Sequence, residues 1–221
     1  MTESSIHAAL KSMYSSSTDQ LEQLVNQYYI DVVTENELIE IQTGNFSNIK
    51  RKLTDLLPHY SIRIVHPIPV ERWILRINQE NQVISRRKSP KKRNILDIFN
   101  ELIYILPFLD YTNFTFEVIL IKDEIIYIDD GRGSWRRKGW SIFDRKLIET
   151  LSTYEFKQSS DFKKLLPVSL PENFTTRQLA MIGGITERLS RRIAYSLYNL
   201  GQLNRIGKEG NAWVYQLNNN K

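Results

Sequence analysis

The sequence predicts an α/β fold of the α+β kind, in which helices flank a mixed β-sheet and a small second domain follows. Three observations predict it. Strand-like runs with period-two alternation follow one another early in the chain, and apolar residues recur at helical spacing on either side of them. Two prolines within residues 166–171 (LPVSLP) then precede a stretch of different character. We therefore expect a sheet domain over residues 1–165 and a smaller domain over residues 166–221.

The composition is that of an ordinary globular protein. The chain has 221 residues, no cysteine, 41% hydrophobic and 25% charged residues, which excludes disordered and disulfide-stapled classes and any thiolate zinc site. The longest apolar run, Leu102–Leu109, contains a proline and is far shorter than the roughly 20 residues of a bilayer span. We expect a soluble, cytoplasmic protein with no membrane contact.

An amphipathic helix and a three-strand meander are predicted at the N-terminal end. Residues 2–13 place apolar side chains at i, i+3, i+4 and i+7, and Glu3 lies on the same stripe. Three strands follow, over residues 20–25, 28–34 and 37–42, and a two-residue gap suited to a hairpin turn separates each from the next. The predicted elements thus begin with a helix and an antiparallel meander.

Two-residue turns would bring three acids into one row. In that register Glu22 faces Asp31, and Asp31 faces Glu40, while Ile30 and Ile39 lie on the core side. Like charges directly opposed in a sheet repel, so something must offset them. A divalent cation with oxygen ligands would do so, and so would a lysine or arginine from a packed helix. Solvated acids on an open face are the third alternative.

A further helix and strand continue the order. Residues 44–57 predict a helix that Ser47 caps, and residues 61–66 predict a strand. Lys50 and Lys52 flank the apolar stripe of this helix and can reach toward the acids. The resulting order is helix, three-strand meander, helix, strand.

That order, with Asp31 on one strand, Glu40-Ile41-Gln42 on the next and an acid on the preceding helix, resembles the restriction-endonuclease-like PD-(D/E)xK nucleases. The resemblance implies Mg²⁺ or Mn²⁺ held by Asp31, Glu40, the carbonyl of Ile41 and Glu3. Glu22 would be a further ligand or an outer-shell base. The activity implied is metal-dependent hydrolysis of DNA phosphodiester bonds. The longer signature YYIDVVTENELIEIQTGNFSNIKRKL resembles an uncharacterised prokaryotic family that joins such a core to a C-terminal winged helix.

Two features depart from the nuclease pattern. No proline precedes Asp31, and Gln42 stands where the pattern has a lysine. A glutamine can orient the attacking water but brings no charge, so Lys52 is the first candidate to supply that charge and Lys50 the second. His7, one turn after Glu3, is a candidate to contact the substrate or a ligand water. The alternative to an enzyme is a degenerate core that binds DNA without cutting it.

Positive charge is concentrated in three segments, which are residues 86–93, residues 130–140 and the predicted helix at residues 186–200. Residues 86–93 (RRKSPKKR) are expected to form a loop after a hairpin of residues 73–77 and 82–86. A helix over residues 94–106 and a hairpin of residues 114–122 and 125–129 are predicted next. Residues 130–140 (DGRGSWRRKGW) then form a second basic spot with two tryptophans. Cations interleaved with exposed aromatic residues suit nucleic acid; the alternatives are that the arginines and lysines are solvated and that the tryptophans anchor the loop to the core. The predicted DNA contacts, including the C-terminal domain, are Arg86, Arg87, Lys88, Lys91, Lys92, Arg93, Arg136, Arg137, Lys138, Arg188, Arg191, Arg192 and Lys208.

The C-terminal segment contains the capping and turn residues of a small helical domain. Thr175 predicts the start of a short helix, Gly183-Gly184 a turn, and residues 186–200 a second helix. The outer face of this second helix is expected to carry Arg188, Arg191, Arg192, Tyr195 and Ser196. A hairpin with a turn at residues 207–211 follows. This order resembles a winged helix-turn-helix, which implies DNA contact through the second helix and the wing. Winged helices also dock proteins, so a partner-recruiting role and a homodimer both stay open.

Overall fold

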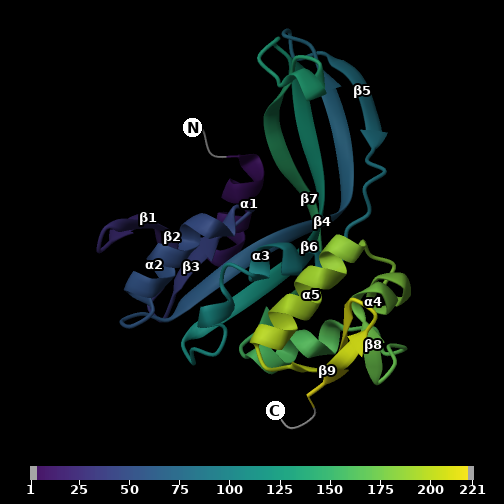
Figure 1. Cartoon of the computed structure of the whole chain (residues 1–221). Coiled ribbons are helices and arrows are strands. Elements are labelled where there is room, and N and C mark those ends of the chain that lie inside the picture. The colour runs from purple at the N-terminus through teal and green to yellow at the C-terminus, as the bar shows by residue number, and fades with distance from the viewer. Residues whose placement is uncertain (1–3, 219–221) are drawn as a thin grey trace. The chain divides into compact units, whose positions relative to one another are not determined.

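The chain folds as an α+β protein, described over residues 4–218 of a computed structural model (Figure 1). The helices are α1 (Ser5–Tyr14), α2 (Ile49–Leu56), α3 (Phe99–Leu102), α4 (Thr176–Ile182) and α5 (Glu187–Asn199). The strands are β1 (Gln20–Val25), β2 (Tyr28–Val33), β3 (Leu38–Ile41), β4 (Ile62–Ile77), β5 (Val83–Lys88), β6 (Phe114–Asp129), β7 (Trp140–Phe156), β8 (Asn173–Thr175), β9 (Leu203–Glu209) and β10 (Ala212–Leu217). Short 3₁₀ turns are η1 (Phe46–Asn48), η2 (Ile95–Ile98), η3 (Leu106–Phe108), η4 (Trp135–Arg137) and η5 (Ser159–Leu165).

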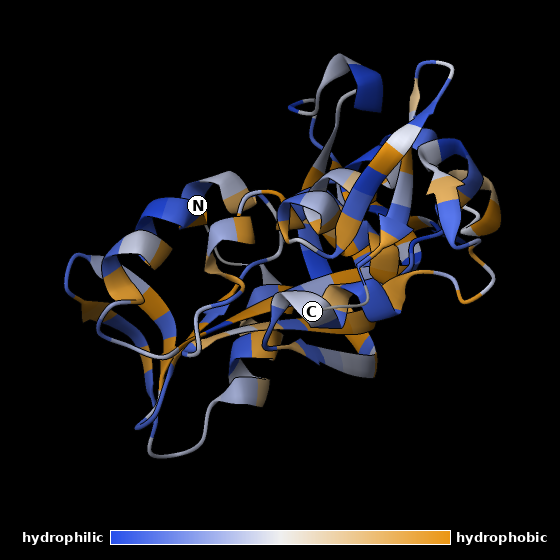
Figure 2. Ribbon diagram, turned by 60° about the horizontal axis from the view of Figure 1, so that its bottom comes forward, coloured by the Kyte–Doolittle hydropathy of each residue, from blue (hydrophilic) through white to orange (hydrophobic). Residues whose placement is uncertain are grey.

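These strands form two sheets within the described residues. The larger has seven strands in the order β1-β2-β3-β4-β6-β7, with β5 paired to β4, and the smaller has the order β8-β10-β9. Hydrophobic and polar residues alternate along the strands, as Figure 2 shows, which is the pattern of a sheet with one face in a core. Within residues 4–218, no helix combines the length and the apolar character needed to cross a membrane.

The chain divides into two compact units. Unit 1 comprises Met1–Thr43, Ile64–Asn94 and Val118–Tyr154, and unit 2 comprises Gly44–Arg63, Ile95–Glu117 and Glu155–Lys221. Strands β4, β6 and β7 continue from one unit into the other. The predicted boundary after residue 165 does not coincide with this division, because residues 166–221 share unit 2 with earlier segments of the chain.

In unit 1, the predicted meander is confirmed. Strands β1, β2 and β3 pair in the predicted register, with Leu24 opposite Tyr29 and Val32 opposite Ile39. Helix α1 packs on the core side of β2 and β3, where its Ile6 and Leu10 are fully buried. The N-terminus of α1 is held by β7, because Ser5 donates its backbone N–H and its hydroxyl to the Asp144 carboxylate at 3.0 and 2.5 Å. Desolvation works against ionisation of Asp144, but these bonds outweigh it and lower its pKa.

The predicted hairpin over residues 114–129 is wrong, because β6 runs through it as one strand. The sequence Lys122-Asp123-Glu124 has the polarity of a turn, yet Asp123 is fully buried in the sheet. Arg72 on β4 donates two hydrogen bonds to its carboxylate, at 2.8 and 2.5 Å, and Arg145 on β7 donates a third at 3.2 Å. Two arginines from neighbouring strands therefore offset the cost of burying the charge of Asp123 inside a strand.

On β4 and β5 the predicted strands are confirmed, but their extents differ from the prediction. The strands predicted over residues 61–66 and 73–77 are parts of one strand, β4, which contains Pro67 and Pro69 in buried positions. Residues 86–88 of the expected basic loop are strand β5, paired with β4 so that Lys88 lies opposite Trp73. Only residues 89–93 of that cluster lie outside regular structure.

In unit 2, aromatic packing replaces the long helix predicted over residues 94–106. That segment breaks into η2, α3 and η3, and its Phe99 packs edge-on against Phe162 of η5. Phe162 in turn stacks on Phe156 of β7 at 4.5 Å between ring centroids. The helix predicted over residues 44–57 begins as α2 only at Ile49, and Ser47 does not cap it, because its hydroxyl donates to the side chain of Asn45.

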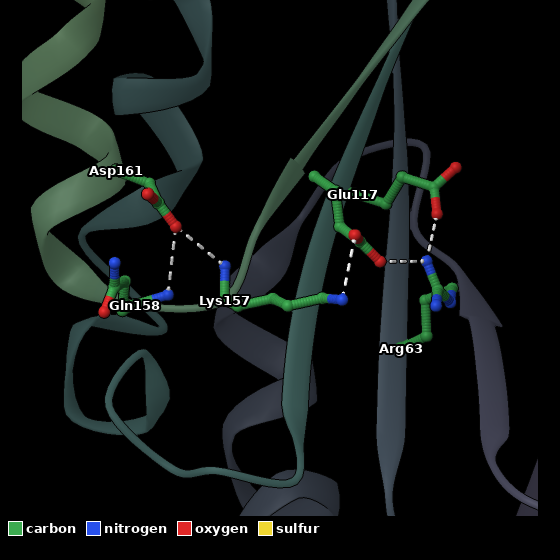
Figure 3. Close-up of polar contacts among 6 residues, drawn as sticks. Arg63, Glu117, Lys157, Gln158 and Asp161 are labelled. Carbon is green, nitrogen blue, oxygen red and sulfur yellow. Dashed lines mark hydrogen bonds and ion pairs between the residues drawn. The ribbon is translucent and has the colours of Figure 1, made fainter.

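Charged side chains form a network in unit 2 (Figure 3). Arg63 bonds the carboxylates of Glu117 and Glu155 at 2.5 and 3.0 Å. Lys157 also contacts Glu155, at 3.1 Å, and donates its backbone N–H to Asp161. The network joins strands β4, β6 and β7 to the start of η5.

The C-terminal part of unit 2 follows the predicted order. Thr175 and Gln178 form a capping box at the start of α4, and Thr186 caps α5. Strand β8 adds a third strand to the predicted hairpin, whose turn is shorter than predicted because β9 extends to Glu209. Ser196, predicted on the outer face of α5, is fully buried.

Candidate functional site

Asp31 lies at a local break in the meander. The pairs between β1 and β2 pass from Leu21 opposite Val32 to Gln23 opposite Ile30, which skips Glu22 and Asp31. The described pairs between β2 and β3 are Val32 with Ile39 and Val33 with Leu38, so they begin one residue after Asp31. Asp31 is therefore a residue of β2 at the point where the regular pairing with both neighbouring strands is interrupted.

The Asp31 carboxylate reaches the next strand and α1. Its Oδ2 accepts the backbone N–H of Ile41 at 2.7 Å and lies 3.1 Å from Nε2 of His7. A regular antiparallel ladder would offer the N–H of Ile41 a backbone carbonyl of β2 instead. Asp31 is thus fixed against the Glu40-Ile41-Gln42 segment, and its side chain is only 16% exposed.

Glu22 is held by a lysine from α1. Its backbone has φ +52°, a left-handed conformation that non-glycine residues seldom adopt within a strand. Its carboxylate forms an ion pair with Nζ of Lys11, whose side chain is almost completely buried. Sequence reasoning allowed for a cation from a packed helix but did not identify Lys11. The signal available was that Lys11 is the only lysine or arginine before Lys50.

Glu40 and Gln42 flank the segment that Asp31 contacts. Both are half-buried. The backbone of Gln42 is fixed to β4, since its N–H donates to the carbonyl of Val65 at 2.8 Å and its carbonyl lies 2.6 Å from Nδ1 of His66. Burial, together with the charges of Arg93 and Arg145, lowers the pKa of His66 to about 4 despite this bond. The imidazole is therefore neutral at pH 7.

Some predicted site residues are not placed beside Asp31. Glu3 lies outside the described residues. Lys52 and Lys50 belong to unit 2 and the Asp31 site to unit 1. Within residues 4–218, no group of three or more histidine, cysteine, aspartate or glutamate side chains has the geometry to hold a metal ion.

Some of the predicted DNA contacts already have a partner within the protein, and the others form no ion pair among the described residues. Arg86 pairs with Glu124, Lys88 with Glu71 and Arg191 with Glu187. Arg192 donates to the backbone and side-chain oxygens of Asn100 at 3.0 and 2.9 Å, which ties α5 to α3. Besides Arg192, the predicted residues that form no ion pair in the described chain are Arg87, Lys91, Lys92, Arg93, Arg136, Arg137, Lys138, Arg188 and Lys208.

Exposed aromatic side chains accompany these cations. Trp135, at 83% exposed, carries Arg136 over its ring, whereas Trp140 is half-buried under Arg76. A second cluster, which sequence reasoning missed, lies on unit 2. Arg205 of β9 lies over the rings of Tyr198 and Trp213, 4.2 and 4.9 Å from their centroids. Lys208 also covers the ring of Trp213, 4.7 Å from its centroid.

Comparison with known proteins places the chain in a family. Residues 4–157 match the model of a domain of unknown function, DUF8091. The chain belongs to the DUF8091 family. An uncharacterized protein of Treponema pallidum (strain Nichols) is 30% identical over 216 residues, covering 97% of this chain and 85% of the relative. No solved structure matches this DUF8091 protein.

Proposed function

We propose that this protein is a metal-dependent DNA endonuclease or related phosphodiesterase, acting in the cytoplasm on a core like that of the PD-(D/E)xK nucleases. The observation that carries the proposal is the contact between Asp31 and the backbone of Ile41. The nuclease motif needs an aspartate beside the acid-x segment of the next strand. Here the meander is broken at Asp31 in a way that brings its carboxylate to that segment.

The residues proposed to hold Mg²⁺ or Mn²⁺ are Asp31, Glu40 and the carbonyl of Ile41, with Glu3 as a further ligand. Carboxylate and carbonyl oxygens are the donors these ions prefer. The bound ion would activate water and stabilise the charge that develops on the phosphate. Gln42 would orient the water, since an amide both donates and accepts hydrogen bonds.

DNA would be held by the basic surfaces. Helix α4, the Gly183-Gly184 turn, α5 and the β9–β10 hairpin follow one another as in a winged helix-turn-helix. We propose that α5 is the recognition helix, with Arg188 exposed on it, and that the hairpin is the wing. The cations and rings around Trp213 then suit phosphate contact and base stacking. Arg192 is left out of this surface because it bonds Asn100.

A second candidate is a DNA-binding or regulatory protein that does not cut. The observation that favours it is charge compensation by α1. His7 contacts Asp31 and Lys11 pairs with Glu22, so two of the acids have partners from the protein itself. In that case the acids stabilise the packing of α1, and divalent metal has no effect on DNA binding.

Substitution of the acids separates the two candidates. Asp31→Asn and Glu40→Gln keep the side-chain size and remove the charge, so they should abolish cleavage while DNA affinity without metal stays within about threefold of the wild type. The measurement is cleavage of plasmid and oligonucleotide DNA across Mg²⁺ and Mn²⁺ titrations. Glu35→Gln, an exposed acid in the β2–β3 turn, is the matched control and should cut normally. Wild-type protein that cuts no DNA would contradict the nuclease proposal.

A further inference from the structure

We propose that Lys11 supplies, from α1, the positive charge that a lysine at the position of Gln42 supplies in the nuclease pattern. The inference rests on the proposed nuclease function and adds a residue to it. Lys52, the first candidate from the sequence, belongs to unit 2. Lys11 lies in unit 1, on the helix that contacts Asp31.

The first argument is the distribution of charge. Residues 1–49 contain two aspartates, five glutamates and a single cationic side chain of the lysine or arginine type, which is Lys11. A lone cation in such a stretch would ordinarily lie in solvent. Lys11 is instead only 6% exposed, although lysine is among the residues least often buried. Burying its charge has a desolvation cost, and the adjacent acids offset it.

The second argument is the position of Lys11 relative to Asp31. Lys11 follows His7 by four residues on α1, so the two side chains lie on the same face of the helix. His7 contacts Asp31, and Lys11 contacts Glu22. Glu22 lies between Leu21 and Gln23, whose partners Val32 and Ile30 flank Asp31. The ammonium group is therefore on the side of α1 that faces the acids.

The third argument is the strained backbone of Glu22. A glutamate at φ +52° persists only where its surroundings favour that conformation, and such positions cluster at functional sites. An ordinary ion pair on the surface of an unstrained strand would need no such distortion. Burial of Leu10, next to Lys11, fixes α1 on the sheet and so fixes the ammonium group. Lys11 is thus a preorganised cation, which is the form in which charge is most effective in catalysis.

The test is the loss and recovery of charge. Lys11→Met should lower the single-turnover cleavage rate about 100-fold, while DNA affinity without metal stays within about threefold. Lys11→Arg keeps the charge and should retain most of the rate. Adding Gln42→Lys to Lys11→Met returns a lysine to the position of the nuclease motif. The double variant should cut at least about tenfold faster than Lys11→Met. A structural ion pair between Lys11 and Glu22 would show no such recovery.

Controls keep the result decisive. Lys164→Met removes another lysine from an ion pair, with Asp161, and should cut at the wild-type rate. Lys11→Gln replaces Lys11→Met if the latter does not fold, as judged by circular dichroism and Tm. If the wild type cuts DNA and Lys11→Met cuts it equally fast, the nuclease proposal stands and the role of Lys11 is overturned. Absence of recovery in the double variant also overturns it, whereas a wild type that cuts no DNA removes both proposals.

Discussion

His66 stays neutral beside the candidate site because the protein interior disfavours its charge. Burial is the largest cause of the lowered pKa, and the nearby charges of Arg93 and Arg145 act in the same direction. Only the bond with the carbonyl of Gln42 opposes them. A neutral imidazole can donate from Nδ1 to that carbonyl, so His66 fixes the backbone that follows Ile41 without adding charge.

This lowered pKa predicts a loss of stability in mild acid. The pKa of histidine is ordinarily 6.5 and that of His66 is about 4 in the folded protein, so between these values the unfolded chain binds a proton that the folded chain does not. Stability therefore falls as the pH falls from 6.5 toward 4, by roughly 3 kcal/mol at about 1.4 kcal/mol per unit. Urea denaturation at pH 5 and pH 7 would measure it. His66→Gln should lose this part of the dependence; an identical pH profile for the variant would contradict the assignment.

At the level of elements, the continuity of β6 depends on Asp123. Asp123→Ala would leave the half-buried Arg72 and Arg145 without their carboxylate, and the loss of one partner of a buried ion pair costs about 3–5 kcal/mol. The free energy of unfolding from denaturant titration checks this. Glu124→Ala is the matched control, since its partner Arg86 is half exposed, and should cost less than about 1 kcal/mol. Equal costs for the two variants would contradict the central role of Asp123.

Elements set by nearby residues could be predicted from the sequence, and elements set by distant partners could not. Two-residue turns fixed the register of β1 to β3, and Thr175 with Gln178 fixed the start of α4, because those signals act within a few residues. The strand through Asp123 depends on arginines from β4 and β7, which no local pattern contains. The same holds for the site. Proximity of Asp31 to β3 followed from the register, but its contact with His7 followed only from the packing of α1.

At the level of the whole molecule, positive charge is present on both units. Residues 91–93 and 136–138 belong to unit 1, and Arg188 and Lys208 belong to unit 2. None of these forms an ion pair within the described chain. Arg86 and Lys88, in contrast, already pair with glutamates. Net charge therefore understates the number of cations available to a polyanion, and the unpaired ones should dominate DNA binding.

Salt dependence of DNA binding tests that division. Each lost phosphate contact lowers the slope of log affinity against log salt by about 1, so Lys91→Gln with Lys92→Gln should lower it by about 2, and Arg188→Gln with Lys208→Gln by a similar amount. Arg86→Gln with Lys88→Gln also removes two charges but should lower the slope by less than about 1, because Glu124 and Glu71 are released at the same time. Fluorescence anisotropy between about 50 and 200 mM salt gives the slopes. Equal changes of slope for the paired and the unpaired cations would contradict the claim that ion pairing within the protein decides which cations contact phosphates. A slope unchanged in every double variant would show that DNA does not bind at these surfaces.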